Sequence, residues 1–169
     1  MLGEQIDFNS CCKENEIIEF LYKIFQDDFI NCRCYLADKI YIDPKSDKLK
    51  DGKEEIFWHV TTKDNPRSKK REFDRERASR LKWIKNIIHN YHHDDIKLFY
   101  HYEKNKKIRL YLWAEKVDFI VIIQKLGRKS SYLVTSFYIN KNYNRKIYSK
   151  RYDAYLNKKD EKLNGCEWF

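Results

Sequence analysis

Apolar residues recur at helical spacing in three segments of the chain. Residues 14–30 and 74–91 each carry an apolar stripe with charged residues between its members, which predicts two amphipathic helices. Asp74 stands just before the second stripe and is its expected N-cap. Residues 142–156 are also helical in character, with tyrosines roughly in register. We therefore expect an N-terminal, a central and a C-terminal helix.

Other segments have the composition and alternation of strands. Residues 35–43 and 56–62 are short candidates, and four longer ones, rich in β-branched and aromatic residues, follow at 97–103, 108–115, 117–124 and 132–140. The connections between these four are short, which makes antiparallel neighbours of them. The pattern predicts an α+β fold, a four-stranded antiparallel meander with the three helices packed on one face.

The length of 169 residues suits one domain. We expect residues 1–169 to form a single unit, with a core at about 56–156, an N-terminal helix and strand extension at 1–50 and a polar tail at 157–169. Hydrophobic residues make up 42% of the chain and aromatic residues 16%, too many for a disordered chain.

No stretch approaches a membrane span, and the N-terminus does not resemble a signal peptide. These features predict a cytoplasmic protein without a membrane partner. The cysteines are odd in number, which indicates free thiols in a reducing compartment; they are Cys11, Cys12, Cys32, Cys34 and Cys166.

The chain is strongly basic, with a net charge of +9 and a pI of about 9.2. Residues 63–85 hold ten basic side chains against four acidic ones. A second basic cluster at 141–151 is interleaved with tyrosines, the combination that single-stranded nucleic acid uses for phosphate contact and base stacking. A solvated charged face is the plain alternative. Nucleic acid is the first candidate partner.

Arg77 falls on the apolar stripe of the central helix, four residues before Leu81. A charge beside a core needs an anionic partner. Asp74, on the same face, could be that partner, or it could serve only as a cap and leave Arg77 free for a phosphate. Arg80 borders the same stripe.

Few residues suit a cofactor or a metal. His89, His92 and His93 are close in sequence, but no second ligand set accompanies them. No glycine-rich phosphate-binding motif is present. We expect neither a metal nor a cofactor, and any phosphate must be recognised by side chains.

Several motifs together resemble a known ribonuclease group. FWHVTTK, REFDRERASRLKWIKNII, RLYLWAEKVDFIVIIQK and YLVTSFYI, followed by a basic tyrosine-rich helix, are similar to the phage- and toxin-associated branch of the Barnase/EndoU/colicin/RelE-like (BECR) superfamily. The resemblance covers roughly residues 56–152. It implies a small metal-independent RNase with helices on a four-stranded antiparallel sheet and RNA on the open face.

The resemblance also implies roles for residues. Its strand-borne histidine falls on His59, and the other catalytic positions fall on Arg71, Asp74, Arg77 and Thr135. The residues expected to bind RNA are Thr62, Lys63, Arg67, Lys69, Lys70, Arg80, Tyr138, Arg145, Lys146 and Arg151.

The sequence leaves open which hydroxyl group of this last strand faces the substrate. Strand parity puts Leu133, Thr135 and Phe137 on the face expected to pack against helices and Ser136 and Tyr138 on the wetter one. Parity therefore favours Ser136 or Tyr138, whereas the resemblance favours Thr135.

The resulting hypothesis is a toxin-type endoribonuclease that acts on RNA such as tRNA or mRNA by 2′-hydroxyl attack. His59, with an ordinary pKa near ~6.5, would be its acid or base. An acidic antitoxin or immunity protein is the expected second partner. The alternatives are a non-catalytic basic RNA- or DNA-binding module, in which His59 is only a packed residue, and an interaction factor for an acidic partner.

Overall fold

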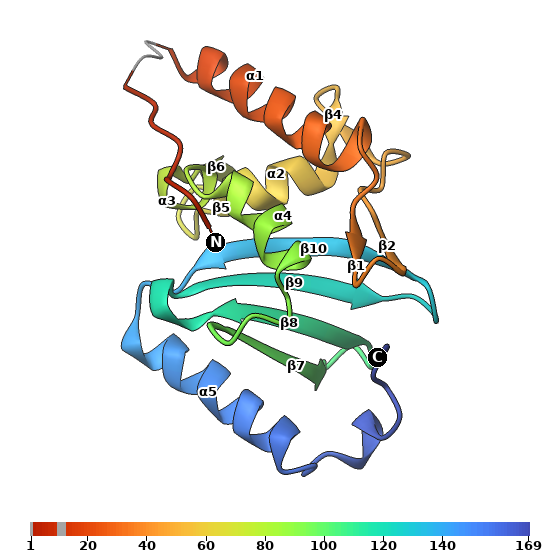
Figure 1. The fold of residues 1–169 in the computed structure, drawn as a ribbon. Coiled ribbons are helices and arrows are strands. Elements are labelled where there is room, and N and C mark those ends of the chain that lie inside the picture. The colour runs from red at the N-terminus through yellow and green to blue at the C-terminus, as the bar shows by residue number, and fades with distance from the viewer. Residues whose placement is uncertain (1, 10–12) are drawn as a thin grey trace.

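A six-stranded sheet forms the centre of the molecule (Figure 1). The computed structural model describes residues 2–9 and 13–169, so Cys11 and Cys12 lie outside the described residues. The strand order is β1-β2-β10-β9-β8-β7. The strands are β1 (Tyr35–Leu36), β2 (Ile40–Asp43), β7 (Ile96–Tyr102), β8 (Ile108–Ala114), β9 (Phe119–Lys125) and β10 (Ser130–Tyr138).

The predicted α+β class is confirmed, but the sheet is larger than the four strands expected. Strands β7 to β10 are the antiparallel meander. Strand β2 adds to it in parallel with β10, and β1 pairs antiparallel with β2. Residues 35–43, expected as one strand, fold back on themselves because Ala37 and Asp38 take φ values of 52° and 53°.

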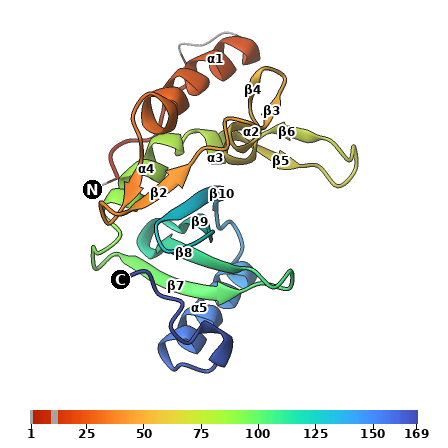
Figure 2. The same ribbon diagram turned by 90° about the vertical axis from the view of Figure 1, so that its right-hand side faces the viewer.

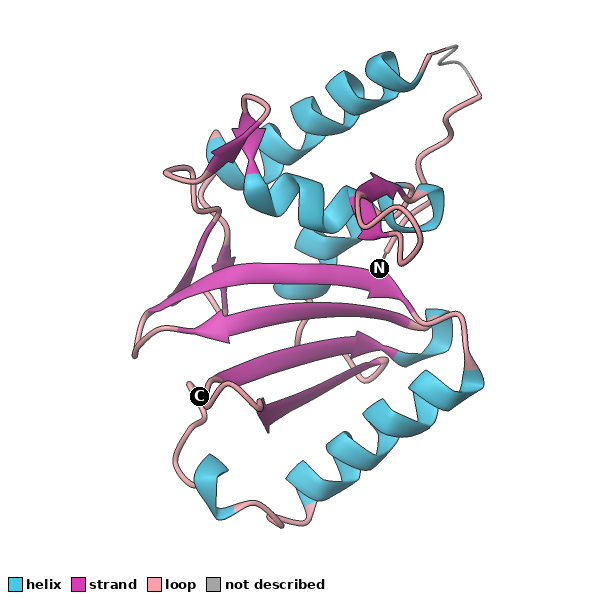
Figure 3. Ribbon diagram, turned by 180° about the vertical axis from the view of Figure 1, so that it is seen from behind, coloured by secondary structure: helices cyan, strands magenta, loops and turns pink. Residues whose placement is uncertain are grey.

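Helices cover both faces of the sheet, which corrects the prediction of one face (Figures 1 and 3). On one face lie α2 (Glu55–Thr61) and α4 (Leu81–His89), with α1 (Glu14–Phe25) and the π-helical turn Gln26–Ile30 packed above them. On the other lies α5 (Asn142–Leu156), whose tyrosines pack on residues such as Phe99 and Trp113. The run FIVIIQ in β9 was the sequence signal for cover on both faces, because a strand without a polar face must be buried on both sides. All six of its residues are buried.

The segment 56–62, expected as a strand, is mostly helix. Its buried residues are Ile56, Phe57, Val60 and Thr61, which is helical spacing. The β-branched and aromatic content of this segment indicates a strand only by propensity, and packing against α1 and β10 overrides it. His59 is therefore borne by a helix.

A short hairpin follows α2 and projects from the body of the molecule (Figure 2). It consists of β5 (Thr62–Asp64) and β6 (Arg71–Phe73). Arg71, one of the expected catalytic residues, lies on β6. A second small hairpin, β3 (Leu49–Lys50) with β4 (Lys53–Glu54), precedes α2.

The central helix is interrupted. It begins with α3 (Arg75–Ala78), breaks at Ser79 and Arg80, and resumes as α4. Asp74 is its N-cap as predicted, with the Asp74 carboxylate accepting a hydrogen bond from the backbone nitrogen of Arg77 at 3.3 Å.

Both ends of the described chain contribute to the core. Phe8 is 2% exposed and packs edge-on against Phe73. In the C-terminal segment, which contains the short 3-10 helix Glu161–Leu163, Leu163 and Cys166 are buried. Cys32, Cys34 and Cys166 are free thiols. The burial thus extends beyond residues 56–156 on both sides.

Candidate functional site

A pocket of about 640 Å³ lies beside β10 and contains His59. Strand β2 pairs with β10 only from Ser130 to Tyr132, and further along β10 its place is taken by α2. The pocket opens at this change of neighbour, with residues of β10 among its lining. Its volume lies in the range typical of ligand sites.

Cations dominate the pocket lining. Six cationic side chains contribute, from four separate segments, against the two carboxylates of Glu55 and Asp64. The cations are Lys45, Lys48, Lys63, Arg71, Arg77 and Lys107. Low-dielectric walls lined by one sign of charge concentrate counter-ions, so the pocket suits an anion.

His59 is half-buried near the C-terminal end of α2. Its Nε2 lies 4.0 Å from Oε1 of Glu55. Burial and the neighbouring charge of Arg71 hold the pKa of His59 below its ordinary value, while Glu55 opposes the shift. The neutral imidazole, which can accept a proton, is thus the favoured form near pH 7.

Arg71 is held by three hydrogen bonds. Its Nε donates to Oγ1 of Thr62 at 2.8 Å, Nη2 to the carbonyl of Thr62 at 2.7 Å and Nη1 to Oδ1 of Asp64 at 3.0 Å. Thr62 itself is buried and donates its hydroxyl to the carbonyl of Trp58 at 2.5 Å. Arg71 therefore presents a fixed positive charge to the pocket, and Thr62 is a support rather than a ligand.

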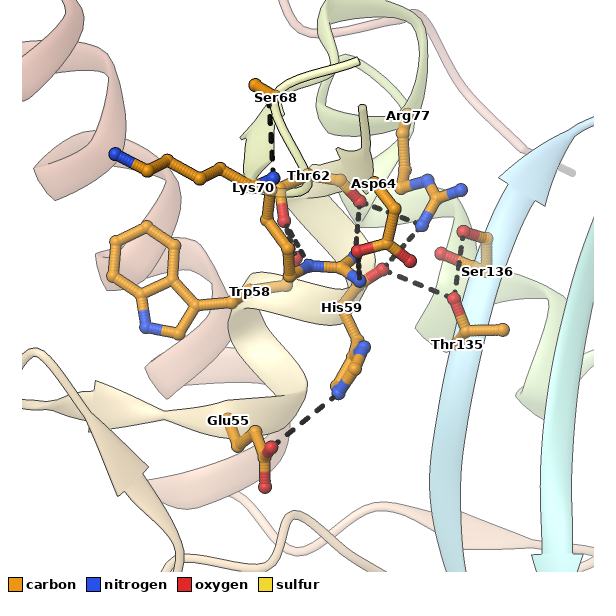
Figure 4. A network of polar contacts seen from close by, with 11 residues as sticks. Glu55, Trp58, His59, Thr62, Asp64, Ser68, Lys70, Arg77, Thr135 and Ser136 are labelled. Atoms are coloured by element: carbon orange, nitrogen blue, oxygen red, sulfur yellow. Dashed lines mark hydrogen bonds and ion pairs between the residues drawn. The ribbon is translucent and has the colours of Figure 1, made fainter. Parts of the chain in front are cut away.

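The guanidinium of Arg77 donates hydrogen bonds to backbone carbonyls at the C-terminal end of α2. Its Nη1 donates to the carbonyls of His59 at 2.7 Å and Thr62 at 2.9 Å (Figure 4). Burial lowers the pKa of Arg77, and its Nε is buried without a hydrogen-bond partner. Asp74 caps α3 and lies 3.7 Å from the ammonium of Lys63. Of the two roles open to Asp74, the cap is the one formed, and Arg77 pairs mainly with helix-end carbonyls.

A register shift in β10 settles the strand-parity question. The shift falls between Leu133 and Thr135, so Leu133 and Phe137 pack in different clusters instead of sharing a face. The expectation of strict alternation was wrong because a β-bulge adds one residue to the strand.

The three candidate hydroxyls therefore have different surroundings. Thr135 lines the pocket and donates its hydroxyl to the carbonyl of His59 at 3.2 Å (Figure 4). Ser136 is fully buried, and its Oγ has no partner. Tyr138 lies beneath Arg80, whose guanidinium carbon is 4.7 Å from the ring centroid. Of the three, only Thr135 lines this pocket.

Three of the expected RNA-binding cations lie at the tip of the β5–β6 hairpin. Arg67, Lys69 and Lys70 are exposed there. The loop is braced internally, since Asn65 accepts from the backbone nitrogen of Arg67 at 2.8 Å and donates to Glu72 at 2.6 Å. With Lys63, these residues extend the positive surface away from the pocket.

The remaining expected cations lie elsewhere. Arg80 is buried against Trp83 and pairs with Glu76 at 2.7 Å. Arg145 and Arg151 are on α5, on the opposite sheet face, where Arg145 contacts the carboxylate of Asp118 and Arg151 donates to the hydroxyl of Tyr111 at 2.9 Å. Lys146, on the same helix, is exposed. The two basic clusters therefore do not form one surface.

Several pocket residues were missed by sequence reasoning. Lys45 and Lys48 belong to the loop after β2, Lys107 to the turn after β7 and Tyr132 to the start of β10. The run PKSDKLK carried a weak signal, since it is lysine-rich. Only the parallel pairing of β2 with β10 brings it to the site.

Within residues 2–9 and 13–169, no group of three or more His, Cys, Asp or Glu side chains is arranged to hold a metal ion. In the same ranges no helix has the length and apolar character needed to cross a bilayer.

Comparison with known proteins finds no matching family model, no matching curated protein and no matching solved structure.

Proposed function

We propose that the protein is a metal-independent endoribonuclease of toxin type that cleaves RNA in the pocket beside β10. The observation that carries the proposal is the position of His59, a half-buried imidazole with a lowered pKa inside a pocket lined by six cations. A phosphodiester needs the cations, and proton transfer needs the imidazole. The resemblance of the sequence to the BECR superfamily supports the same reaction.

The proposed reaction is an attack of the ribose 2′-hydroxyl on the adjacent phosphorus. Neutral His59 accepts the hydroxyl proton as the O2′–P bond forms and the P–O5′ bond breaks. The leaving 5′-oxygen takes up a proton, for which Lys63 and solvent water are the sources at the pocket mouth. The products are a 2′,3′-cyclic phosphate and a 5′-hydroxyl.

The other residues have supporting roles in this proposal. Arg71 and Lys63 provide the positive charge that stabilises the phosphorane, and such a preorganised group is commonly worth ~3–4 kcal/mol. Arg77 and Thr135 act on His59 through its carbonyl oxygen. They are positioning residues, which differs from the catalytic roles implied by the resemblance.

A non-catalytic RNA-binding module is the second candidate. The observation that favours it is that both arginines beside His59 donate to backbone carbonyls, an arrangement that also stabilises a helix end without any chemistry. RNA is the proposed partner in both cases. An acidic inhibitor protein that covers the pocket remains a prediction.

The test is incubation of purified protein with total RNA in excess chelator, followed by mapping of the cleaved ends. We expect discrete cuts that end in cyclic phosphate, lost in His59→Ala and retained in His93→Ala, a control in the exposed turn after α4. RNA that is bound but left intact by the wild-type protein would favour the binding module. Cuts that persist in His59→Ala would remove His59 from the mechanism.

A further inference from the structure

One part of the pocket is not explained by phosphate chemistry. Tyr132, at the start of β10, lines the same cavity as His59, together with Leu133, Val134 and Leu126. Leu126 is 52% exposed although it is large and apolar. The cavity thus combines a cationic part at the end of α2 with an aromatic and apolar part near the β9–β10 turn.

Distance along the strand separates the two parts. Tyr132 precedes Thr135 by three residues, but the bulge makes this stretch of β10 span only two residues of β9, or about 7 Å at ~3.3 Å per residue. Thr135 in turn contacts the backbone of His59. A phosphate near His59 would leave its attached nucleoside in reach of Tyr132. We propose that Tyr132, with Leu126 beside it, is a nucleobase-stacking subsite of the pocket.

Lys45 already contacts the tyrosine ring. Its ammonium lies 5.0 Å from the ring centroid of Tyr132 and 3.8 Å from Asp43. Tyr132 is half-buried, and the Lys45 ammonium covers one face of its ring in a cation–π contact. A nucleobase stacks on the same type of surface, and the displaced ammonium is then free to contact the ligand phosphate.

The subsite narrows the substrate class of the proposed nuclease, on which the RNA part of this inference rests. A base inside a duplex is covered on both faces by its neighbours and cannot reach Tyr132. A base in a single strand or a loop can be splayed out and stacked on an aromatic side chain. The substrate is therefore RNA that is unpaired at the nucleotide beside the cleaved bond.

Binding of non-cleavable ligands tests the subsite without any catalysis. The probes are adenosine 5′-monophosphate, uridine 5′-monophosphate and ribose 5-phosphate, followed by NMR titration at low salt. We expect the two nucleotides to bind roughly ten-fold or more tightly than ribose 5-phosphate, the range of one base–aromatic stack. Tyr132→Phe should keep this preference. Tyr132→Leu, which fills similar volume without a π face, should lose most of it.

Tyr143→Leu is the matched control, because Tyr143 is 70% exposed on α5, on the other side of the sheet. Equal binding of nucleotide and ribose phosphate, binding of neither, or a preference that survives in Tyr132→Leu would each overturn the subsite. RNA cleavage is scored separately. A base preference without cleavage would leave the subsite standing and reject the nuclease, whereas cleavage without a base preference would do the reverse.

Discussion

At the scale of the residue, the surroundings of His59 determine which form of the imidazole is present. Burial and Arg71 favour the neutral ring, and Glu55 favours the charged one. We expect NMR titration to give a pKa of His59 below ~6.5, the ordinary value. Glu55→Gln removes the charge that opposes the shift and should lower the pKa of His59 further. Asp153→Asn, an exposed change on α5, is the control.

The direction of this shift fixes the expected pH dependence. A general base is lost when it is protonated, so kcat/KM should fall on the acid side as pH drops through the pKa of folded His59, which is below ~6.5. The same shift means that the folded state disfavours the charged ring. Stability contributed by neutral His59 is therefore lost as pH falls below ~6.5. A pKa at or above 6.5, or one unaffected by Glu55→Gln, would contradict this account of the site.

At the scale of the element, the C-terminal end of α2 is held by side chains that arrive from two other elements. Arg77, from α3, and Thr135, from β10, both donate to the carbonyl of His59. Arg77→Ala should lower the free energy of unfolding by about 1–3 kcal/mol, because the part-buried carbonyls of His59 and Thr62 each lose a charged donor and keep only Thr135 and Arg71. Urea unfolding measures this. Arg67→Ala, at the exposed hairpin tip, should stay within about 0.5 kcal/mol of wild type.

Sequence reasoning recovered the elements whose local pattern and packing agree. The four strands of the meander, α5 and the Asp74 cap are of this kind. It failed at α2, where propensity indicates a strand and packing makes a helix, and at the bulge near Val134, where one extra residue reverses strand parity. The motif singled out His59, which lines the pocket. Tyr132, which lines the same pocket, was not singled out for this site, because only the long-range pairing of β2 brings its surroundings together.

The β5–β6 hairpin carries an element-scale prediction about RNA binding. Each phosphate contact to a single strand contributes about 0.7 to the slope of log K against log salt. Replacing Arg67, Lys69 and Lys70 by Gln should therefore reduce the slope by about 2. The control replaces three exposed lysines by Gln: Lys141, which is the N-cap of α5, and Lys146 and Lys150 within α5. Equal effects of the two triple variants would place RNA on both sheet faces.

At the scale of the whole molecule, the sheet separates two charged surfaces with different surroundings. On the α5 side, Arg145 and Arg151 contact Asp118, Glu115 and Tyr111 and hold the helix to the sheet. On the α2 side, the pocket cations outnumber the carboxylates six to two. The cations that make up the net charge of +9 are thus paired to different degrees on the two sides of the sheet. A pocket with such an excess of cations attracts polyanions, and His59 lies inside it.

The N-terminal segment is part of the structure that supports this pocket. Phe8 packs against Phe73 of β6, and the backbone nitrogen of Ile6 donates to the carbonyl of Ser79 at 2.8 Å. Phe8→Ala should cost about 3–5 kcal/mol, the usual loss for a buried phenylalanine. Phe20→Ala, at a position 44% exposed on α1, should cost far less. Equal losses in urea unfolding would show that Phe8 does not belong to the core. The expected difference would support a structural role for residues 2–9, which pack against β6 through Phe8 and Phe73. Because Arg71 lies on the same strand, this packing would also stabilise the site.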